Sequence, residues 1–437
     1  MSTAQTAISR HRRVPQEPGT PAPRLARYFS DCRGAFLVSE SQNLQSMTHK
    51  HATASAPGRV NLIGEHTDYS SLPVMPVAIQ KRLRVTAEAI GDEVVEATSA
   101  MFSGVFRSDR ADNPAWSRYL EPVIALVEPM GARLTIDGDL PATGGLSSSS
   151  ALSVALLAAL LRLSGIEPEP DRLVDLAVRA ERAVGVEGGA MDQTVIVHAV
   201  AGTALRIEFD PTARRPVPIP ENVAFVAGYS GEPAPKGGSA RDAYNARVVG
   251  TRTAALLLGF DPPVLGSVTA ELGDVLAELP EYAVPEPEAA LLSKGRFSQT
   301  DPLPVRAWTR HVLSEARRVD AAEEALRQGE IEALGRLFDE SHASLAGDFG
   351  VSTPGLEALV TAARAAGAAG ARLTGAGLGG WAVAVCHRDR ASTVAEAMAS
   401  VACPSTTATT WPACAPTATG ISPTSRTPRL RMGRTPT

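Results

Sequence analysis

The stretch Ala56-Pro57-Gly58-Arg59-Val60-Asn61-Leu62-Ile63-Gly64-Glu65-His66-Thr67-Asp68-Tyr69 concentrates polar side chains around a short apolar run. Residues 60–63 are typical of a strand, and Gly64 favours a tight turn after it. Within ten residues the chain then offers the hydrogen-bonding groups of Arg59, Glu65, His66 and Asp68. This cluster suits a hydroxyl-rich small molecule, although taken alone it is equally typical of a solvated loop after an edge strand.

A second stretch, Pro141-Ala142-Thr143-Gly144-Gly145-Leu146-Ser147-Ser148-Ser149-Ser150-Ala151, is a glycine- and serine-rich loop that runs into an apolar helix. The pattern predicts a helix over 147–163, with serine side chains capping its start. Glycines before a helix N-terminus admit a phosphate, and hydroxyls can donate to it or ligate Mg²⁺. The Walker pattern is absent, and taken alone a serine-capped helix after a glycine turn is equally plausible. The two stretches together favour transfer of phosphate to a sugar.

A carboxylate stands at the predicted start of a further helix, in Gly188-Gly189-Ala190-Met191-Asp192-Gln193. The helix dipole favours a negative charge at this position. Asp192 is also a candidate base for a substrate hydroxyl, as in kinases. Taken alone, stabilisation of the dipole is the simpler interpretation of this aspartate.

A glycine loop, Thr374-Gly375-Ala376-Gly377-Leu378-Gly379-Gly380, matches the pattern G-x-G-x-x-G. A dinucleotide site requires a helix after this pattern, but the strand-like Trp381-Ala382-Val383-Ala384-Val385 follows. We therefore expect a flexible loop that packs against the phosphate site, with a plain glycine hairpin as the alternative.

The composition indicates a globular chain that is large enough for two domains, with 437 residues of which 44% are hydrophobic. The net charge of −5 and the lack of a basic run argue against nucleic acid or an anionic membrane as a partner. We expect neither a membrane span nor a secretory signal. The cysteines are scattered without metal-ligand spacing or a disulfide framework, which favours the cytoplasm. The patterns H-E-x-x-H and G-x-S-x-G are absent, which argues against a zinc site and a serine hydrolase.

Strands and helices alternate in a way that predicts an α+β fold of two domains. Strands are expected over 60–63, 74–79, 83–90, 133–136, 223–227, 371–374 and 381–386, and helices over 147–163, 171–184, 240–258, 305–327, 331–345 and 356–366. We predict a poorly ordered lead-in at 1–52, an N-terminal domain at 53–222, a C-terminal domain at 223–402 and an atypical, disordered tail at 403–437. The tail is expected to lack the strand and helix that should complete the second domain, which leaves a sheet edge exposed.

The four motifs, in this order, resemble those of the galactokinase branch of the GHMP small-molecule kinases. The resemblance covers roughly residues 55–390, and the first motif is specific to this branch, whereas the serine and glycine loops are shared across the superfamily. It implies a two-domain GHMP kinase fold, with an N-terminal domain like domain 2 of ribosomal protein S5 and a ferredoxin-like C-terminal domain. The site is expected between the two domains.

The resemblance also implies a role for individual residues. Asp192 would be the base at the sugar C1 hydroxyl, with Arg59 beside it keeping it ionised and stabilising charge. The implied sugar-binding residues are Glu65, His66, Asp68, Gly189 and Tyr244. The implied ATP-binding residues are Gly144, Gly145, Leu146, Ser147, Ser148 and Ser149, with Trp116 and Tyr119 near the adenine. Ser148 and Glu181 would hold Mg²⁺.

The function implied is phosphorylation of galactose by ATP in the cytoplasm, by a monomer or weak oligomer. Another GHMP sugar kinase, acting on an N-acetylhexosamine, a uronic acid or a pentose, is an alternative. A non-catalytic regulator that senses galactose and ATP is a second one, but the intact serine loop, Arg59 and Asp192 favour catalysis. The chain has Ser70-Ser71-Leu72-Pro73 where the family usually has Asn-Gly-Gly, at a turn expected to border the sugar.

Overall fold

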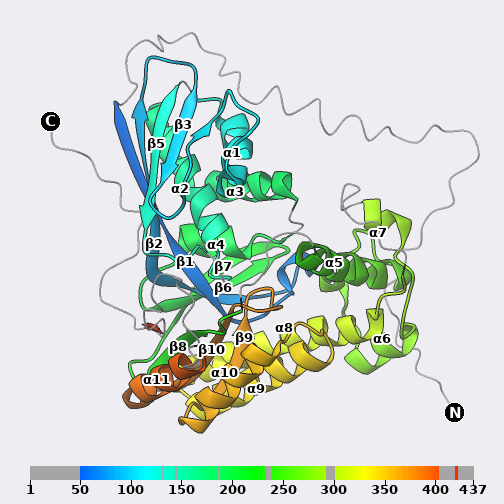
Figure 1. Cartoon of the computed structure of the whole chain (residues 1–437). Coiled ribbons are helices and arrows are strands. Elements are labelled where there is room, and N and C mark those ends of the chain that lie inside the picture. The colour runs from blue at the N-terminus through cyan, green and yellow to red at the C-terminus, as the bar shows by residue number, and fades with distance from the viewer. Residues whose placement is uncertain are drawn as a thin grey trace, which may run out of the picture.

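The computed structural model describes residues 50–129, 131–142, 145–185, 188–232, 239–291, 301–402 and 419–421. The predicted lead-in at 1–52 therefore lies outside the described residues except for its last three, and the tail at 403–437 except for 419–421. Figure 1 shows one sheet with its helices in the upper half of the molecule and a second sheet, flanked by long helices, in the lower half. None of the helices in the described ranges is long and apolar enough to cross a membrane.

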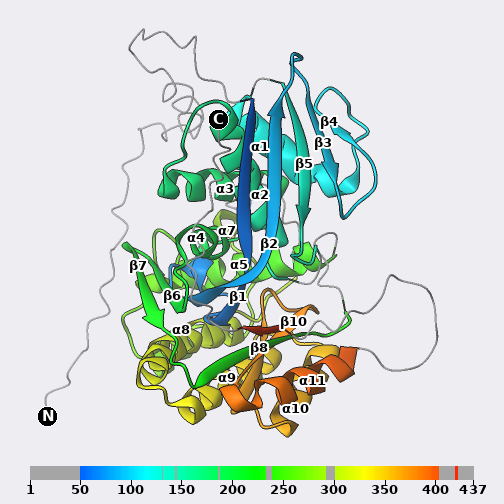
Figure 2. The ribbon, with the colours of Figure 1, turned by 90° about the vertical axis from the view of Figure 1, so that its left-hand side faces the viewer.

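The upper half is built on a five-stranded sheet in the order β1-β2-β5-β3-β4. Its strands are β1 (His51–Ile63), β2 (Met75–Ala89), β3 (Val95–Ser99), β4 (Phe106–Arg107) and β5 (Ala132–Gly138). The helices of this half are α1 (Leu120–Val127), α2 (Ser148–Leu163), α3 (Pro170–Val184) and α4 (Met191–His198). All pairs in the sheet are antiparallel except β3 with β5. Figure 2 shows the sheet in front of α1, α2 and α3.

Helix α2 is the centre of the upper core, because every residue in it except Ser149 is buried. A helix that is apolar on all sides belongs in the interior, and α2 packs on β1 and β2. The predicted helix is confirmed, with Gly165 just past its end in a left-handed conformation. The predicted serine cap is wrong, since Ser147 precedes the helix with a φ of 58° and its side chain makes no cap hydrogen bond.

One expected break in the first sheet is absent. The sequence predicts two strands, over 74–79 and 83–90, where the structure has the single strand β2. The polar residues between them, 80–82, lie within this strand, and the exposed Gln80 is one of them. A strand alternates inward and outward side chains, so polar residues inside it mark its solvent face rather than its end.

The lower half contains a four-stranded antiparallel sheet in the order β11-β8-β10-β9. Its strands are β8 (Val223–Tyr229), β9 (Gly370–Thr374), β10 (Trp381–His387) and β11 (Thr419–Ile421). Its helices are α5 (Ser239–Leu257), α6 (Leu272–Glu278), α7 (Pro287–Leu291), α8 (Val305–Gln328), α9 (Ile331–Gly347), α10 (Pro354–Ala365) and α11 (Ala391–Ala402). A small hairpin of β6 (Thr203–Phe209) and β7 (Thr212–Pro218) lies between the halves in sequence. The β-α-β-β-α-β order from β8 to β11 is ferredoxin-like, as expected.

The second sheet is buried on both faces. Phe225 of β8 stacks on Phe338 of α9, with ring centroids 6.1 Å apart. Its neighbour Val226 faces the other core, which includes Met398 of α11. Alternate residues of one strand thus serve two cores, as the period of two dictates.

The expectation that the tail contributes no strand is wrong at one place. β11 pairs with β8, so that Thr419 lies opposite Ala227 and Ile421 opposite Phe225. This short segment covers the β8 edge of the sheet, which we expected to be exposed from the composition of the tail.

The two halves meet where β1 ends. The end of β1 contacts β9 and α8, and Figure 2 shows β1 running from the upper sheet towards the lower one. Thr374, at the end of β9, accepts a hydrogen bond from the Asn61 amide at 3.1 Å and donates one to the Asn61 carbonyl at 2.9 Å. The turn after β1 is therefore held between elements of both halves.

Candidate active site

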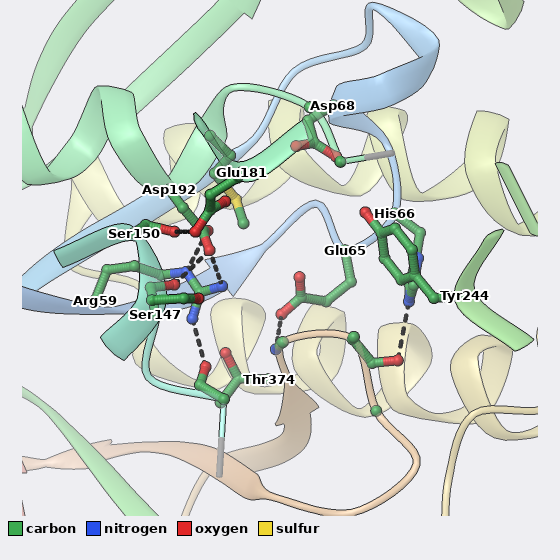
Figure 3. Close-up of a pocket in the computed structure, with 18 of the residues that line it drawn as sticks. Arg59, Glu65, His66, Asp68, Ser147, Ser150, Glu181, Asp192, Tyr244 and Thr374 are labelled. Atoms are coloured by element: carbon green, nitrogen blue, oxygen red, sulfur yellow. Dashed lines mark hydrogen bonds and ion pairs between the residues drawn. The ribbon is translucent and has the colours of Figure 1, made fainter. Parts of the chain in front are cut away.

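A cavity of about 200 Å³ opens between the two halves, and its lining comes from both. The upper half contributes the end of β1 with the turn that follows, the serine loop, α3 and the start of α4. The lower half contributes the first turns of α5 and the glycine loop after β9. Figure 3 shows these side chains converging from several elements.

Arg59 and Asp192 meet at the centre of this site although they are 133 residues apart. The Arg59 Nε donates to Asp192 Oδ1 at 2.6 Å and Nη2 donates to Oδ2 at 2.8 Å, which makes a bidentate ion pair. The Arg59 side chain is 7% exposed and that of Asp192 is 23% exposed. Burial alone would lower the pKa of Arg59, but the charges of Asp192 and Glu65 outweigh it and raise that pKa. Arg59 therefore stays a cation, and Asp192 keeps an edge towards the cavity.

The serine loop is tied to the same pair. Arg59 Nη1 donates to the Gly145 carbonyl at 2.5 Å, and the Ser147 hydroxyl donates to Asp192 Oδ2. Gly145, with a φ of +97°, has open space where a Cβ would stand. The predicted Gly144 lies outside the described residues. The loop thus brings an unobstructed backbone and a hydroxyl beside the carboxylate.

Glu181 of α3 faces the cavity and is held by two side chains. The Ser150 hydroxyl donates to its Oε1 at 2.8 Å, and Gln193 Nε2 donates to its Oε2 at 2.7 Å. Ser148, the other implied metal ligand, donates its hydroxyl to the Ala142 carbonyl at 2.9 Å and does not line the cavity. Ser150 and Gln193 therefore orient the Glu181 carboxylate at the cavity.

Glu65 is almost fully buried, and its carboxylate joins the two halves. Asn61 Nδ2 donates to Glu65 Oε2 at 2.8 Å, while the backbone N–H of Gly375 donates to Oε1 at 2.6 Å. Burial raises the pKa of Glu65, and the cations Arg372 and Arg59 only partly offset this. Glu65 lines the cavity with a side chain whose orientation is fixed from both sides.

His66 forms the aromatic end of the cavity with Tyr244 of α5, and their ring centroids are 5.6 Å apart. Burial lowers the pKa of His66 far below its usual value, and the nearby His311 and Arg247 lower it further. The ring is therefore neutral, and His66 Nε2 must carry its proton because it contacts the Ala376 carbonyl at 3.2 Å. His66 Nδ1 then accepts from the Tyr69 hydroxyl at 3.1 Å.

Asp68 connects the first motif to the start of α4. Backbone N–H groups of Tyr69 and Met191 donate to its carboxylate, and Gly189 lies so close that a Cβ there would be 2.9 Å from Asp68 Cβ. Burial raises the pKa of Asp68 to about 6, and the charge of Asp192 contributes to this shift. Asp68 and Gly189 thus form one wall beside Asp192.

The structure brings most of the predicted site residues together. The predicted residues that line the cavity are Arg59, Glu65, His66, Asp68, Tyr119, Gly145, Ser147, Ser149, Glu181, Gly189, Asp192 and Tyr244. Leu146 is buried and its carbonyl accepts the Arg59 N–H at 3.2 Å, while Trp116 donates its indole N–H to the Ser103 carbonyl. Neither Leu146 nor Trp116 lines the cavity.

The glycine loop lies as expected, because the position of a Gly375 Cβ would be 3.3 Å from the Gly145 carbonyl oxygen. Eleven lining residues were not among the predicted site residues: Ser150, Gly188, Met191, Gln193, Arg241 and residues 374–379. All of them except Arg241 stand inside quoted motifs and could have been found there, whereas no pattern marks Arg241.

The fold and this site define a kinase of the GHMP class. The chain matches the family described as GHMP kinases N terminal domain over residues 117–199 and that described as GHMP kinases C terminal over 322–402. It also matches the galactokinase galactose-binding signature over residues 45–89.

Relatives of known name indicate which branch of the GHMP kinases this chain resembles. A galactokinase of Roseiflexus sp. (strain RS-1) is 36% identical over 356 residues, which is 79% of this chain and 86% of the relative. A galactokinase of Chloroflexus aurantiacus is 37% identical over 357 residues, with the same coverage of both chains. The crystal structure of Lactococcus lactis galactokinase complexed with galactose superposes with a TM-score of 0.67 at 28% identity, covering 82% of this chain and 91% of that one. The chain belongs to the galactokinase family.

Proposed function

We propose that the protein transfers the γ-phosphoryl group of ATP to the C1 hydroxyl of galactose and forms galactose 1-phosphate and ADP. The observation that carries this proposal is the bidentate pair of Arg59 and Asp192, which lies between the serine loop and the cluster of Glu65, His66 and Asp68. The signature that this chain shares with galactokinases spans the sugar side of that arrangement.

Asp192 is the proposed proton acceptor. The C1 oxygen attacks the γ-phosphorus, the bond from that phosphorus to the bridging oxygen breaks, ADP leaves with the electron pair, and the hydroxyl proton passes to the carboxylate. A carboxylate offers about four lone-pair sites. Arg59 Nε, Arg59 Nη2 and Ser147 Oγ use three of them, which leaves one for the sugar hydroxyl. The geometry of the pair therefore supports Asp192 as a base whose orientation is fixed and which can still accept one hydrogen bond.

Arg59 and the serine loop are proposed to stabilise the transferring phosphoryl group. Its transition state is loose and spreads negative charge over the peripheral oxygens, so positioning and electrostatics supply most of the rate. The buried cation of Arg59 lies beside the route of transfer. The start of α2 offers backbone N–H groups, and Gly145 leaves its approach open.

The donor set fits a magnesium ion that is shared with the nucleotide. Among the described residues, no group of three or more His, Cys, Asp or Glu side chains could hold a metal. Mg²⁺ typically takes one or two protein ligands and completes its shell with phosphate and water. Glu181, which lines the cavity, and Ser148, whose hydroxyl would have to turn from the Ala142 carbonyl, are the proposed protein ligands. The ion would neutralise charge on the β- and γ-phosphates.

The sugar is proposed to lie against Glu65, His66, Asp68, Gly189 and Tyr244. Asp68 and Gly189 form one wall, and His66 with the ring of Tyr244 forms the aromatic end of the cavity. ATP is proposed to bind at Gly144–Ser149, with Trp116 and Tyr119 towards the adenine. Since the reaction consumes ATP, we also propose a cytoplasmic location.

The test is sugar-dependent formation of ADP by the purified full chain, with the product identified by ³¹P NMR. The panel contains galactose, glucose, N-acetylgalactosamine, galacturonate and arabinose, and galactose should give the highest kcat/KM. A higher kcat/KM for another sugar would reassign the substrate. Binding of ATP and galactose without turnover would support the regulator instead.

The role of Asp192 is tested with Asp192→Asn against Asp175→Asn, which changes an exposed carboxylate on α3. We expect Asp192→Asn to lower kcat by at least about 100-fold, in the range of general-base contributions. Asp175→Asn should be neutral. Near-normal turnover by Asp192→Asn would exclude the base role.

A further inference from the structure

Glu315 is a fully buried carboxylate that the reaction described above does not use. It lies on α8, in the lower half, and it does not line the cavity. Its Oε1 accepts the backbone N–H of Gly64 at 2.9 Å and that of Glu65 at 3.3 Å. One carboxylate oxygen from the lower half therefore holds two successive backbone N–H groups of the turn that carries the proposed sugar-binding residues.

The turn needs such a partner because of its conformation. Gly64 has a φ of +92°, and its Cα is enclosed by Val74, Pro73 and Val319 so closely that a Cβ would be within 2.9 Å of each. Successive N–H groups around a left-handed residue form a concave anion site. Here the anion is Glu315, so the direction in which the chain leaves β1 is set by a side chain of α8.

The charge of Glu315 is compensated inside the protein. Arg318 Nε donates to Oε2 at 2.8 Å, the Ser341 hydroxyl donates to Oε1 at 2.7 Å, and Arg372 Nη2 is 3.7 Å away. Burial alone would raise the pKa of Glu315, but Arg372 and Arg318 reverse this and bring it to about 2. The carboxylate is therefore ionised at every pH at which the protein would work.

The same group of residues holds Glu65 itself. His311 Nε2 donates to the Glu65 carbonyl at 3.1 Å, and Arg372 Nη1 donates to the Leu62 carbonyl at 2.7 Å. Arg372 Nη2 is also 3.7 Å from the Glu65 carboxylate. Glu65 is thus fixed by contacts on its N–H, its carbonyl and its side chain, and the N–H contact is the one made by Glu315.

We propose that Glu315 is a positioning residue for sugar binding: by holding the Gly64 and Glu65 amides it sets the orientation of Glu65 and His66 at the cavity. This inference rests on the proposed function, because the task that it assigns to Glu315 is to position residues that are proposed to bind the sugar. A purely structural role would predict loss of stability with no selective effect on the sugar.

The test compares Glu315→Gln with Glu323→Gln. Glu323 lies on the same helix and also pairs with arginines, Arg215 and Arg327, but away from the cavity. Glu315→Gln keeps the shape and removes the charge. We expect the KM and the calorimetric Kd for galactose to rise at least tenfold, while the KM for ATP changes less than twofold. Glu323→Gln should leave all three constants unchanged.

Ser341→Ala is the second variant, because it removes a single hydrogen bond to the same carboxylate and keeps the ion pair with Arg318. It should raise the KM for galactose about threefold and serves if Glu315→Gln does not fold. An unchanged KM for galactose in a folded variant, or equal losses for galactose and ATP, would overturn the positioning role. If the wild-type chain neither binds nor phosphorylates any sugar of the panel, the proposed function fails first, and this role fails with it.

Discussion

Gly189→Ala is the substitution that tests the geometry of the sugar wall most directly. Gly189 does not have a left-handed backbone, so an alanine can adopt its conformation. The added methyl group, however, would overlap Asp68 Oδ2 and Cγ and lie 2.9 Å from Asp68 Cβ. To restore ordinary van der Waals separation, the Asp68 carboxylate has to move by about 1 Å.

The size of the effect follows from the contacts that Asp68 would lose. A movement of this size breaks the hydrogen bond from the Met191 N–H to a charged acceptor, which is worth about 1.5–3 kcal/mol. Forcing the side chain away from its rotamer adds about 0.5–1.5 kcal/mol. We therefore expect Gly189→Ala to lower the free energy of unfolding by about 2–4 kcal/mol. A misplacement of about 1 Å at the sugar should also lower kcat/KM for galactose by about 10- to 100-fold, with the KM for ATP little changed.

The assay combines urea unfolding with steady-state kinetics for galactose and ATP. The control is Gly273→Ala in α6, where a Cβ meets no atom within 4 Å and should be neutral or slightly stabilising. The same substitution in an Asp68→Ala background should cost less, because the carboxylate is gone and only the contact of 2.9 Å with the Cβ of residue 68 remains. A kcat/KM within twofold of wild type, or an equal loss in the Asp68→Ala background, would refute this reasoning.

Three further predictions concern the same region. Arg59→Lys removes the bidentate contact with Asp192 and should lower kcat by at least about 100-fold with a smaller change in the KM for galactose, measured by initial rates; a kcat within tenfold of wild type would contradict it. Ser71 has a φ of 59°, and Ser71→Gly should relieve a left-handed strain of about 1–2 kcal/mol. After the entropic cost of glycine, the free energy of unfolding measured in urea should rise by about 0.5–1 kcal/mol, and a lower unfolding midpoint would argue against strain at this residue. Burial raises the pKa of Asp68 to about 6, so the ionised acceptor is present above that pH; kcat/KM for galactose should fall as the pH drops below about 6, and Asp68→Asn should remove this acid limb from the profile.

The sequence was sufficient to predict the elements that local physics determines. Helix α2 is apolar along its whole length, and such a run forms a buried helix in almost any context. The strand after the glycine loop was also predictable, because residues 381–385 are apolar and follow a turn. The pairing of Arg59 with Asp192 spans 133 residues and came from the resemblance between motifs, not from spacing.

The contacts that the sequence did not predict are made with backbone groups, which leave no pattern of side chains in the sequence. Glu315 binds backbone N–H groups 251 and 250 residues away, and any residue except proline carries such a group. Arg372 stands in a run that reads as an ordinary strand, yet it is fully buried and donates to the carbonyls of β1. The strand β11 exists because the edge of β8 offers free backbone groups, a property of the folded sheet.

These non-local contacts explain why the site forms only when both halves of the molecule are in place. Arg59, Glu65, His66, Asp68 and Asp192 all come from the upper half of the chain. The conformation of the turn that carries three of them is nevertheless completed from the lower half, by Glu315 on the amides and by Gly375 on the Glu65 carboxylate. Since a left-handed glycine and two buried charges are stable only with their partners in place, docking of the two halves and formation of the sugar site are one event. Substitutions deep in the interface between the halves should therefore raise the KM for galactose more than the KM for ATP.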